Sequence, residues 1–354
     1  MDNKVIISGI QQVGIGIPNL AEAFGWYNKY LGFDARIFDD EGVAELMLPY
    51  TGGKPQQRRA ILAMNMRGGG GLEIWQPKGR EQRKPEKQIL LGDLGLYVAK
   101  YKAGDAQKAY EELKNKGADL LSEVMTSPAG VKHFFLKDLN DNILQIEEDA
   151  YRFHDPKKNI GGVNGLIIGV SDMERSVKFY GDALGYDTVV NDSEGVFDDF
   201  AALPGGAHKV RRVLLSRSET PKGAFAPIFG TSVIELVQAF DYTPVKIFEN
   251  RWWGDAGYIH VCFDIQGMKA LQNRCEALGH PFVCDSNDSF DMGEAAGHFT
   301  YVEDPDGALI EFVETHKVPV MKKLGWYIDL RKRNPEKPLP SWMLKAIGLK
   351  REKA

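Results

Sequence analysis

The sequence predicts an α+β fold built from four βαβββ modules that pair into two domains. The 354 residues exceed the roughly 250–300 that one hydrophobic core usually serves. A long stretch near the start of the chain is repeated in its second half. Short consecutive strands joined by turns, rather than strict strand–helix alternation, argue against a doubly wound sheet.

The repeat defines a duplicated domain. Residues 13–32 (VGIGIPNLAEAFGWYNKYLG) match residues 166–185 (LIIGVSDMERSVKFYGDALG). Each stretch has an apolar strand, a polar break and a helix that ends in Leu-Gly. The similarity continues from Arg58-Arg59 to Arg211-Arg212 and from residues 72–77 to residues 234–239. Repetition over this length indicates that a whole domain, not a short structural repeat, was duplicated.

A weaker repeat divides each half into two modules. Residues 93–117 and 260–279 each have the pattern of a strand followed by a helix, and strand pairs follow at 133–148 and 298–314. The expected modules cover residues 8–78, 88–149, 162–240 and 256–315. We therefore expect an N-terminal domain over residues 1–150, a C-terminal domain over residues 151–316 and a tail over residues 317–354.

The tail is basic, while the whole chain is mildly acidic. The net charge is −5, but the tail holds 11 Lys/Arg against 3 Asp/Glu. The net negative charge argues against a nucleic-acid partner for the protein as a whole. The tail either lies on the acidic body or binds an anion or a partner. Its aromatic residues, including Trp326 and Trp342, favour a segment that packs on the body or on a second subunit, which leaves a homodimer open.

Composition and the N-terminal segment predict a cytoplasmic protein. The three cysteines form no CxxC pattern and no disulfide framework. The first residues lack the features of a secretory signal, and no apolar run reaches the roughly 18 residues that span a bilayer. We expect no membrane partner and a small-molecule substrate.

Three stretches resemble the vicinal oxygen chelate superfamily, which includes glyoxalases, bleomycin resistance proteins and extradiol dioxygenases. They are GIGIPNLAEAFGWYNKYLGF, GVSDMERSVKFYGDALGY and YVEDPDGALIEFVE. The resemblance implies curled mixed sheets around a cavity. It also implies two metal-ligand positions in each module: an early first-strand position, usually His, and a last-strand position, usually Glu. Two paired modules then surround one divalent ion.

The resemblance locates these positions in this sequence. In module order they are Gln12 and Glu73, Asp93 and Gln145, Gly165 and Glu235, and His260 and Glu311. If consecutive modules pair, Glu235, His260 and Glu311 bind one ion in the C-terminal domain, and the N-terminal domain holds none. Imidazole and carboxylate ligands suit Zn, Ni, Mn, Fe or Co.

Further residues are candidates for the same site. Cys262 faces the same way as His260 along a strand, and Arg59 and Arg212 could clamp a carboxylate or phosphate. The alternative for both arginines is a solvated strand with surface ion pairs. Tyr301 occupies the position of a tyrosine in the related dioxygenases, and Glu235 or Glu311 would move the proton.

These features favour a metal-dependent enzyme acting on a small carbonyl compound, as a glyoxalase-like lyase or an epimerase-like isomerase. One alternative is a non-catalytic ligand-binding protein of the bleomycin-resistance type. The other is a ring-cleaving dioxygenase, which is disfavoured because Gly165 stands where such enzymes have a second His.

Overall fold

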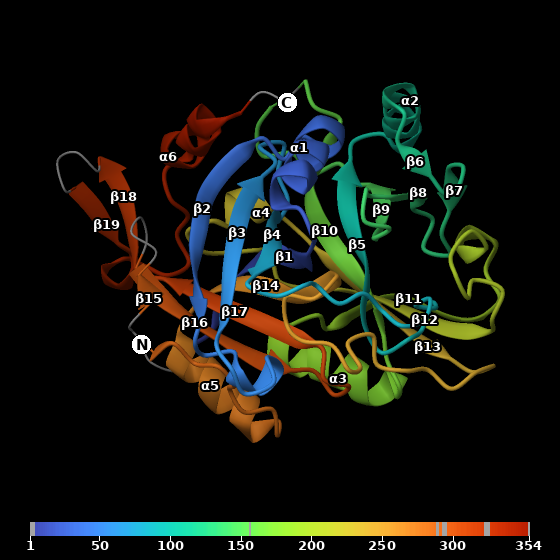
Figure 1. Ribbon diagram of the computed structural model, residues 1–354. Coiled ribbons are helices and arrows are strands. Elements are labelled where there is room, and N and C mark those ends of the chain that lie inside the picture. Colours follow the sequence, from blue (N-terminus) through green and yellow to red (C-terminus); the bar gives the residue numbers. More distant parts are fainter. Residues whose placement is uncertain (1–3, 156, 288–289, 292–295, 322–325, 353–354) are drawn as a thin grey trace.

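The computed structural model describes residues 4–155, 157–287, 290–291, 296–321 and 326–352, and these residues form the four predicted βαβββ modules (Figure 1). The first module has β1 (Ile6–Gly16), α1 (Leu20–Leu31), β2 (Ala35–Ala44), β3 (Gln56–Met64) and β4 (Gly71–Lys78). The second has β5 (Gly95–Ala103), α2 (Ala106–Lys116), β6 (Asp119–Leu120), β7 (Met125–Thr126), β8 (Lys132–Lys137) and β9 (Ile143–Glu148).

The second half of the chain repeats this order. The third module has β10 (Ile160–Gly169), α3 (Met173–Leu184), β11 (Thr188–Gly195), β12 (Val210–Ser216), α4 (Ala226–Phe229) and β13 (Val233–Ala239). The fourth has β14 (Gly257–Gln266), α5 (Met268–Ala277), β15 (Phe290–Asp291), β16 (Ala296–Glu303) and β17 (Leu309–Thr315). The tail adds β18 (Lys317–Met321), β19 (Trp326–Asp329) and α6 (Ser341–Ala346).

Side-chain caps define the starts of two helices, α1 and α3. The side chain of Asn19 accepts a hydrogen bond from the Glu22 amide at the start of α1, and Asp172 does the same for Arg175 in α3. Such caps satisfy amides that have no partner within the helix. Gly32 ends α1 in the left-handed conformation, with φ of 72°, which glycine adopts without strain.

The two sheets join modules that are not consecutive. The first sheet has eight strands in the order β15-β16-β17-β14-β1-β4-β3-β2, so it combines the fourth module with the first. The second sheet has nine strands, and its main path β11-β12-β13-β10-β5-β9-β8-β6 combines the third module with the second. We expected modules one and two in one domain and modules three and four in the other. The structure differs because the first strands pair across the halves, β1 with β14 and β10 with β5, both antiparallel.

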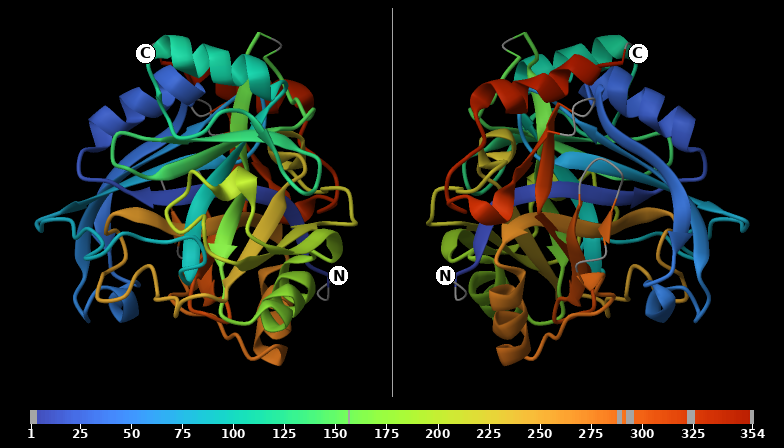
Figure 2. Two further views of the ribbon diagram at one scale, coloured as in Figure 1. Left: turned by 90° about the vertical axis from the view of Figure 1, so that its right-hand side faces the viewer. Right: turned by 90° about the vertical axis from the view of Figure 1, so that its left-hand side faces the viewer.

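Consecutive modules still contact each other through side chains. The Tyr27 hydroxyl on α1 donates to Asp138 at 2.8 Å, and the Tyr180 hydroxyl on α3 donates to Asp304 at 3.0 Å. Figures 1 and 2 show the helices outside the curled sheets. One large core, with members such as Val13, Leu166 and Val261, spans both sheets. The two sheets therefore belong to a single packed body.

The tail packs on the body as predicted, but through aliphatic side chains, because Trp326 and Trp342 are 57% and 61% exposed. Leu330, Leu339 and Leu344 are buried in one cluster with Met64 and Phe229. Near the end of the chain, the Glu352 amide donates to the Asp34 carbonyl at 2.8 Å. In the part of the chain that the structure describes, no helix combines the length and apolar character needed to cross a bilayer.

Candidate metal centre

The topology brings four family ligand positions to one point in the first sheet. Gln12 lies on β1, Glu73 on β4, His260 on β14 and Glu311 on β17. We call these four residues the histidine cluster. The strand register explains the convergence: Glu73 pairs with Gly14, and Gly14 faces His260 across the β1–β14 ladder. The predicted pair His260 and Glu311 is thus brought together, and its partners come from the first module.

The polar atoms of the histidine cluster converge on one another. His260 Nε2 lies 3.2 Å from one carboxylate oxygen of Glu73 and 3.2 Å from one of Glu311. Gln12 Nε2 donates to Glu73 at 3.1 Å. One ligand atom from each of Glu73, His260 and Glu311 can be chosen so that all three lie within 4.8 Å of one another. This spacing allows all three to reach a common metal ion.

Several atoms of the histidine cluster are buried without a hydrogen-bond partner. They are Gln12 Oε1, His260 Nδ1 and Nε2, and Glu311 Oε2, because the 3.2 Å contacts of His260 Nε2 are ion-pair contacts without hydrogen-bond geometry. A buried polar atom without a partner is costly. Three of these atoms, one from each residue, are the donors that a divalent ion would use. The donor set of one imidazole, two carboxylates and an amide oxygen therefore fits a metal ion.

His260 offsets part of the negative charge of the two carboxylates in the cluster. Burial alone would lower the pKa of His260, but the Glu311 and Glu73 carboxylates outweigh it and raise the pKa to about 9. Burial likewise opposes ionisation of Glu311, yet His260 lowers the pKa of that carboxyl below its ordinary value. The site thus stabilises a positive charge between two carboxylates.

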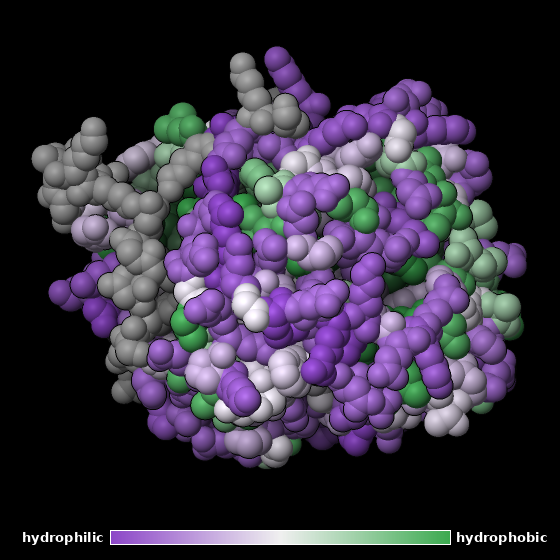
Figure 3. Space-filling view, viewed as in Figure 1, coloured by the Kyte–Doolittle hydropathy of each residue, from purple (hydrophilic) through white to green (hydrophobic). Residues whose placement is uncertain are grey.

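The histidine cluster borders a large cavity. The cavity has a volume of about 1130 Å³, and Gln12, Glu73 and Glu311 are among its lining residues. Aromatic and aliphatic side chains form much of the remaining wall, including Trp75, Trp253, Phe299, Phe229, Met343 and Leu344. The last two lie on α6, so the tail closes part of the cavity. The face in Figure 3 is largely hydrophilic, with small separate hydrophobic patches.

Comparisons with known proteins agree with this architecture. Residues 162–312 match the model of the Glyoxalase/Bleomycin resistance protein/Dioxygenase superfamily. This part of the chain is therefore similar in sequence to the superfamily. No curated protein matches the sequence.

Two solved structures share this fold over most of the chain. Glyoxalase I from Zea mays is 15% identical, with 88% of this chain and 92% of that chain covered and a TM-score of 0.52. A putative dioxygenase from Bacillus subtilis subsp. subtilis str. 168 is 14% identical, with 87% and 86% covered and a TM-score of 0.58. At this identity the likeness concerns the fold alone.

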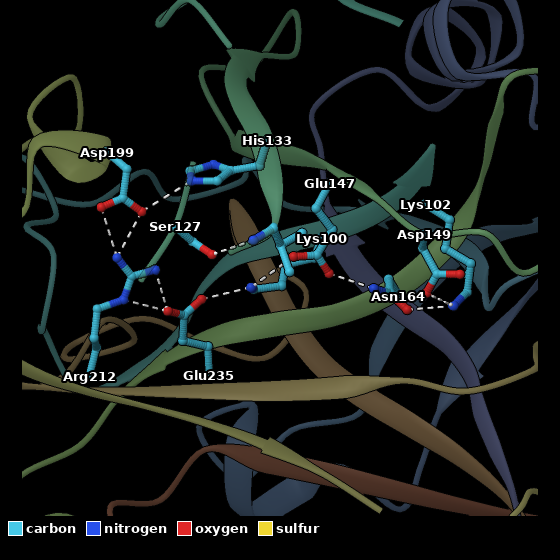
Figure 4. Close-up of polar contacts among 11 residues, drawn as sticks. Lys100, Lys102, Ser127, His133, Glu147, Asp149, Asn164, Asp199, Arg212 and Glu235 are labelled. Carbon is cyan, nitrogen blue, oxygen red and sulfur yellow. Dashed lines mark hydrogen bonds and ion pairs between the residues drawn. The ribbon is translucent and has the colours of Figure 1, made fainter. Parts of the chain in front are cut away.

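Glu235, predicted as the third metal ligand, lies in the second sheet and not with His260. Its carboxylate accepts from Arg212 Nε at 2.7 Å and lies 2.6 Å from Lys100 Nζ. Lys100 also contacts Glu147 at 3.1 Å (Figure 4). We call Lys100, Glu147, Arg212 and Glu235 the lysine cluster. Glu235 was assigned to the wrong site because consecutive modules do not share a sheet.

In the lysine cluster each charged side chain is paired with an opposite charge of the same cluster. Burial alone would raise the pKa of Glu235, but Arg212 and Lys100 outweigh it and lower the pKa to about 2. Burial alone would lower the pKa of Lys100, but Glu147 and Glu235 raise it above its ordinary value. Arg212, predicted to bind substrate, instead holds Glu235 and Asp199.

Of the other predicted residues, Tyr301 and Cys262 lie near the histidine cluster and Arg59 does not. Tyr301 lines the cavity, and its ring centroid lies 5.6 Å from that of His260. Cys262 is fully buried beside Glu311 in the strand register, where burial and Glu311 raise the pKa of its thiol well above the ordinary value. Arg59 faces solvent and pairs with Asp39, just as Arg211 pairs with Asp192. The sequence alignment of the two arginine pairs was therefore shifted by one residue.

Lys100 and Glu147 were missed, and the register shows why. In every module the first-strand position lies two residues before the strand partner of the last-strand Glu. In the second module the last-strand Glu is Glu147, and its strand partner is Lys102. The first-strand position, two residues earlier, is therefore Lys100. Asp93 lies before β5 and accepts from the amides of Leu90 and Val245. Two lysines in the apolar run YVAKYKA were the available signal.

Proposed function

We propose that the protein is a divalent-metal-dependent enzyme that moves a proton next to a carbonyl group of a substrate bound in the cavity. The observation that carries the proposal is the histidine cluster, whose unpartnered Gln12, His260 and Glu311 atoms converge beside the cavity. A bound Zn, Mn, Fe, Co or Ni ion would polarise a carbonyl oxygen as a Lewis acid.

The residues around the cluster have separate roles in this proposal. Gln12, Glu73, His260 and Glu311 would hold the ion. Glu311 borders the cavity, and its Oε2 lies 3.2 Å from His260 Nε2, so when this carboxylate leaves the ion it would accept the proton from the carbon next to the carbonyl. Tyr301 keeps its proton, because burial first and then Glu311 raise the pKa of its phenol, and it can donate a hydrogen bond to the substrate.

The cavity indicates the kind of carbonyl compound. Its 1130 Å³ volume lies at or above the upper end of ordinary ligand pockets, which are about 300–1,000 Å³. Trp75 and Trp253, 4.3 Å apart between ring centroids, and Met343 contribute apolar wall. A substrate with a sizeable apolar or aromatic portion fits this lining better than a small polar aldehyde.

The donor set favours proton transfer over ring cleavage. Non-haem Fe(II) oxygenases commonly use two His and one carboxylate. The histidine cluster supplies one His, two carboxylates and one amide, and the first-strand position of the third module is Gly165 in the other sheet.

Metal analysis with two matched variants tests the proposal. Wild-type protein should bind a divalent ion at the histidine cluster, and Glu73→Gln should lose it. Glu235→Gln makes the same chemical change in the lysine cluster and should keep the ion. If the wild type stays metal-free after incubation with Mn, Fe, Co, Ni and Zn, the enzyme proposal fails. Loss of the ion in Glu235→Gln but not in Glu73→Gln would reject the proposed ligand set.

A further inference from the structure

Lys100 holds in the second sheet the place that His260 holds in the first. His260 lies two residues before Cys262, which pairs with Glu311 on the neighbouring parallel strand. Lys100 lies two residues before Lys102, which pairs with Glu147 in the same manner. Both side chains are fully buried, with relative exposure of 0% and 2%. The register therefore makes Lys100 the counterpart of a metal-ligand position.

The carboxylates around Lys100 match those around His260. His260 Nε2 lies between the Oε2 atoms of Glu73 and Glu311. Lys100 Nζ lies between the Oε2 atoms of Glu235 and Glu147, at 2.6 and 3.1 Å. In both sheets the two carboxylates come from the last strands of the paired modules. The positive centre differs: in the second sheet it is an ammonium that is part of the chain (Figure 4).

The remaining oxygens of the lysine cluster are also occupied. Glu235 Oε1 accepts from Arg212 Nε at 2.7 Å, and Glu147 Oε1 accepts from the Asn164 amide. The free volume beside these residues is about 10 Å³, close to the minimum for one water molecule. Gly165, at the fourth ligand position, has no room for a side chain, since a Cβ there would lie 1.9 Å from the Val233 carbonyl oxygen.

We propose that the Lys100 ammonium replaces a metal ion in the second sheet, so that the chain binds one divalent ion, and that exchanging Lys100 for a ligand residue opens a second metal site between Glu147 and Glu235. The comparison with the histidine cluster rests on the proposed function, but the contacts of Lys100 do not. A metal ion and the Lys100 ammonium cannot occupy the same space between these carboxylates.

Metal binding in a Glu73→Gln background isolates the second sheet. We would titrate Co²⁺ and Zn²⁺ and follow Co²⁺ absorption together with elemental analysis after desalting. Glu73→Gln alone should bind neither ion tightly. Glu73→Gln combined with Lys100→His should bind one ion, with a Co²⁺ spectrum that shows nitrogen and oxygen ligands. The same double variant with Glu147→Gln added should lose at least tenfold in Co²⁺ affinity, the low end of what loss of a supporting group costs a metal site.

Three outcomes would overturn the inference. They are two ions per wild-type chain, a tightly bound ion in Glu73→Gln with Lys100 intact that is lost when Glu147→Gln is added, and a folded Lys100→His variant that binds no ion in the second sheet. If Lys100→His does not fold, Lys100→Gln tests the same point with a smaller neutral side chain, and wild-type stoichiometry still decides whether Lys100 excludes metal. A wild type without any ion, combined with a Lys100→His variant that gains one, would reject the proposed function and leave this inference standing.

Discussion

Gly14 and His260 approach each other so closely that no side chain fits at position 14. A Cβ added to Gly14 would lie 2.3 Å from Cε1 and 2.7 Å from Nε2 of the imidazole. Both residues lie at the centre of the first sheet, where β1 of the first module pairs with β14 of the fourth. The histidine cluster therefore depends on a contact between the first and the fourth module, which are far apart in sequence but adjacent in the sheet.

Gly14→Ala should displace the imidazole and weaken metal binding. We expect at least a tenfold loss of affinity, the low end of what disturbing a supporting group costs a metal site, and a loss of stability of about 1–3 kcal/mol from overpacking. Competition with a chromophoric chelator measures the affinity. Gly25→Ala on the exposed face of α1, where a Cβ meets nothing within 4 Å, is the control. It should stabilise the protein by about 0.5–1 kcal/mol and leave the affinity unchanged.

Lys100→Met should destabilise the protein strongly, because it leaves two buried carboxylates without their shared cation. Breaking a buried ion pair by removing one partner costs about 3–5 kcal/mol. Guanidinium unfolding measures the change. The double variant Lys100→Met with Glu147→Gln should recover part of the loss, since one of the two negative charges is also removed. A single variant as stable as the wild type would show that water reaches these carboxylates.

The local structure follows from the sequence more directly than the pairing of modules does. The caps at Asn19 and Asp172 and the glycine at the end of α1 depend on neighbouring residues, so a single sequence reveals them. The partner strand of β1 is joined to it by backbone hydrogen bonds, and backbone groups are the same in every strand, so the sequence does not reveal which strand pairs with β1. Either pairing satisfies a duplicated chain, and only the structure shows that Glu73, rather than Glu235, joins His260.

The wrong assignment of the two ligand positions in the second module has a different cause. Asp93 and Gln145 were assigned by matching the sequence of the second module to the two ligand positions of the family. The strand register instead selects Lys100 and Glu147. A lysine at a ligand position looks like a surface residue in sequence, and its role becomes visible only when Glu147 and Glu235 are placed on either side of it.

Acid should weaken the protein partly through Glu235. Its pKa falls from the ordinary value of 4.5 to about 2, since Arg212 and Lys100 outweigh the effect of burial. A carboxyl whose pKa is lowered by folding stabilises the folded state above the unfolded pKa, and this stabilisation is lost as pH falls from about 4.5 towards 2. Glu235→Gln should thus be less stable than the wild type at neutral pH, and the difference should shrink across this window. Unfolding curves at several pH values measure it, and a difference that stays constant down to pH 2 would assign the acid response to other groups.

The packing of the tail can be tested with two leucines that lie five residues apart. Leu344 on α6 is 1% exposed and belongs to the cluster that contains Met64 and Phe229, whereas Leu349 is 86% exposed. Leu344→Ala should cost about 2–5 kcal/mol, the usual range for a buried leucine. Leu349→Ala should change stability by less than about 0.5 kcal/mol. Urea unfolding of both variants gives the comparison. Equal, small effects would mean that the tail separates from the body in solution, and the cavity wall contributed by Met343 and Leu344 would then be absent in the free protein.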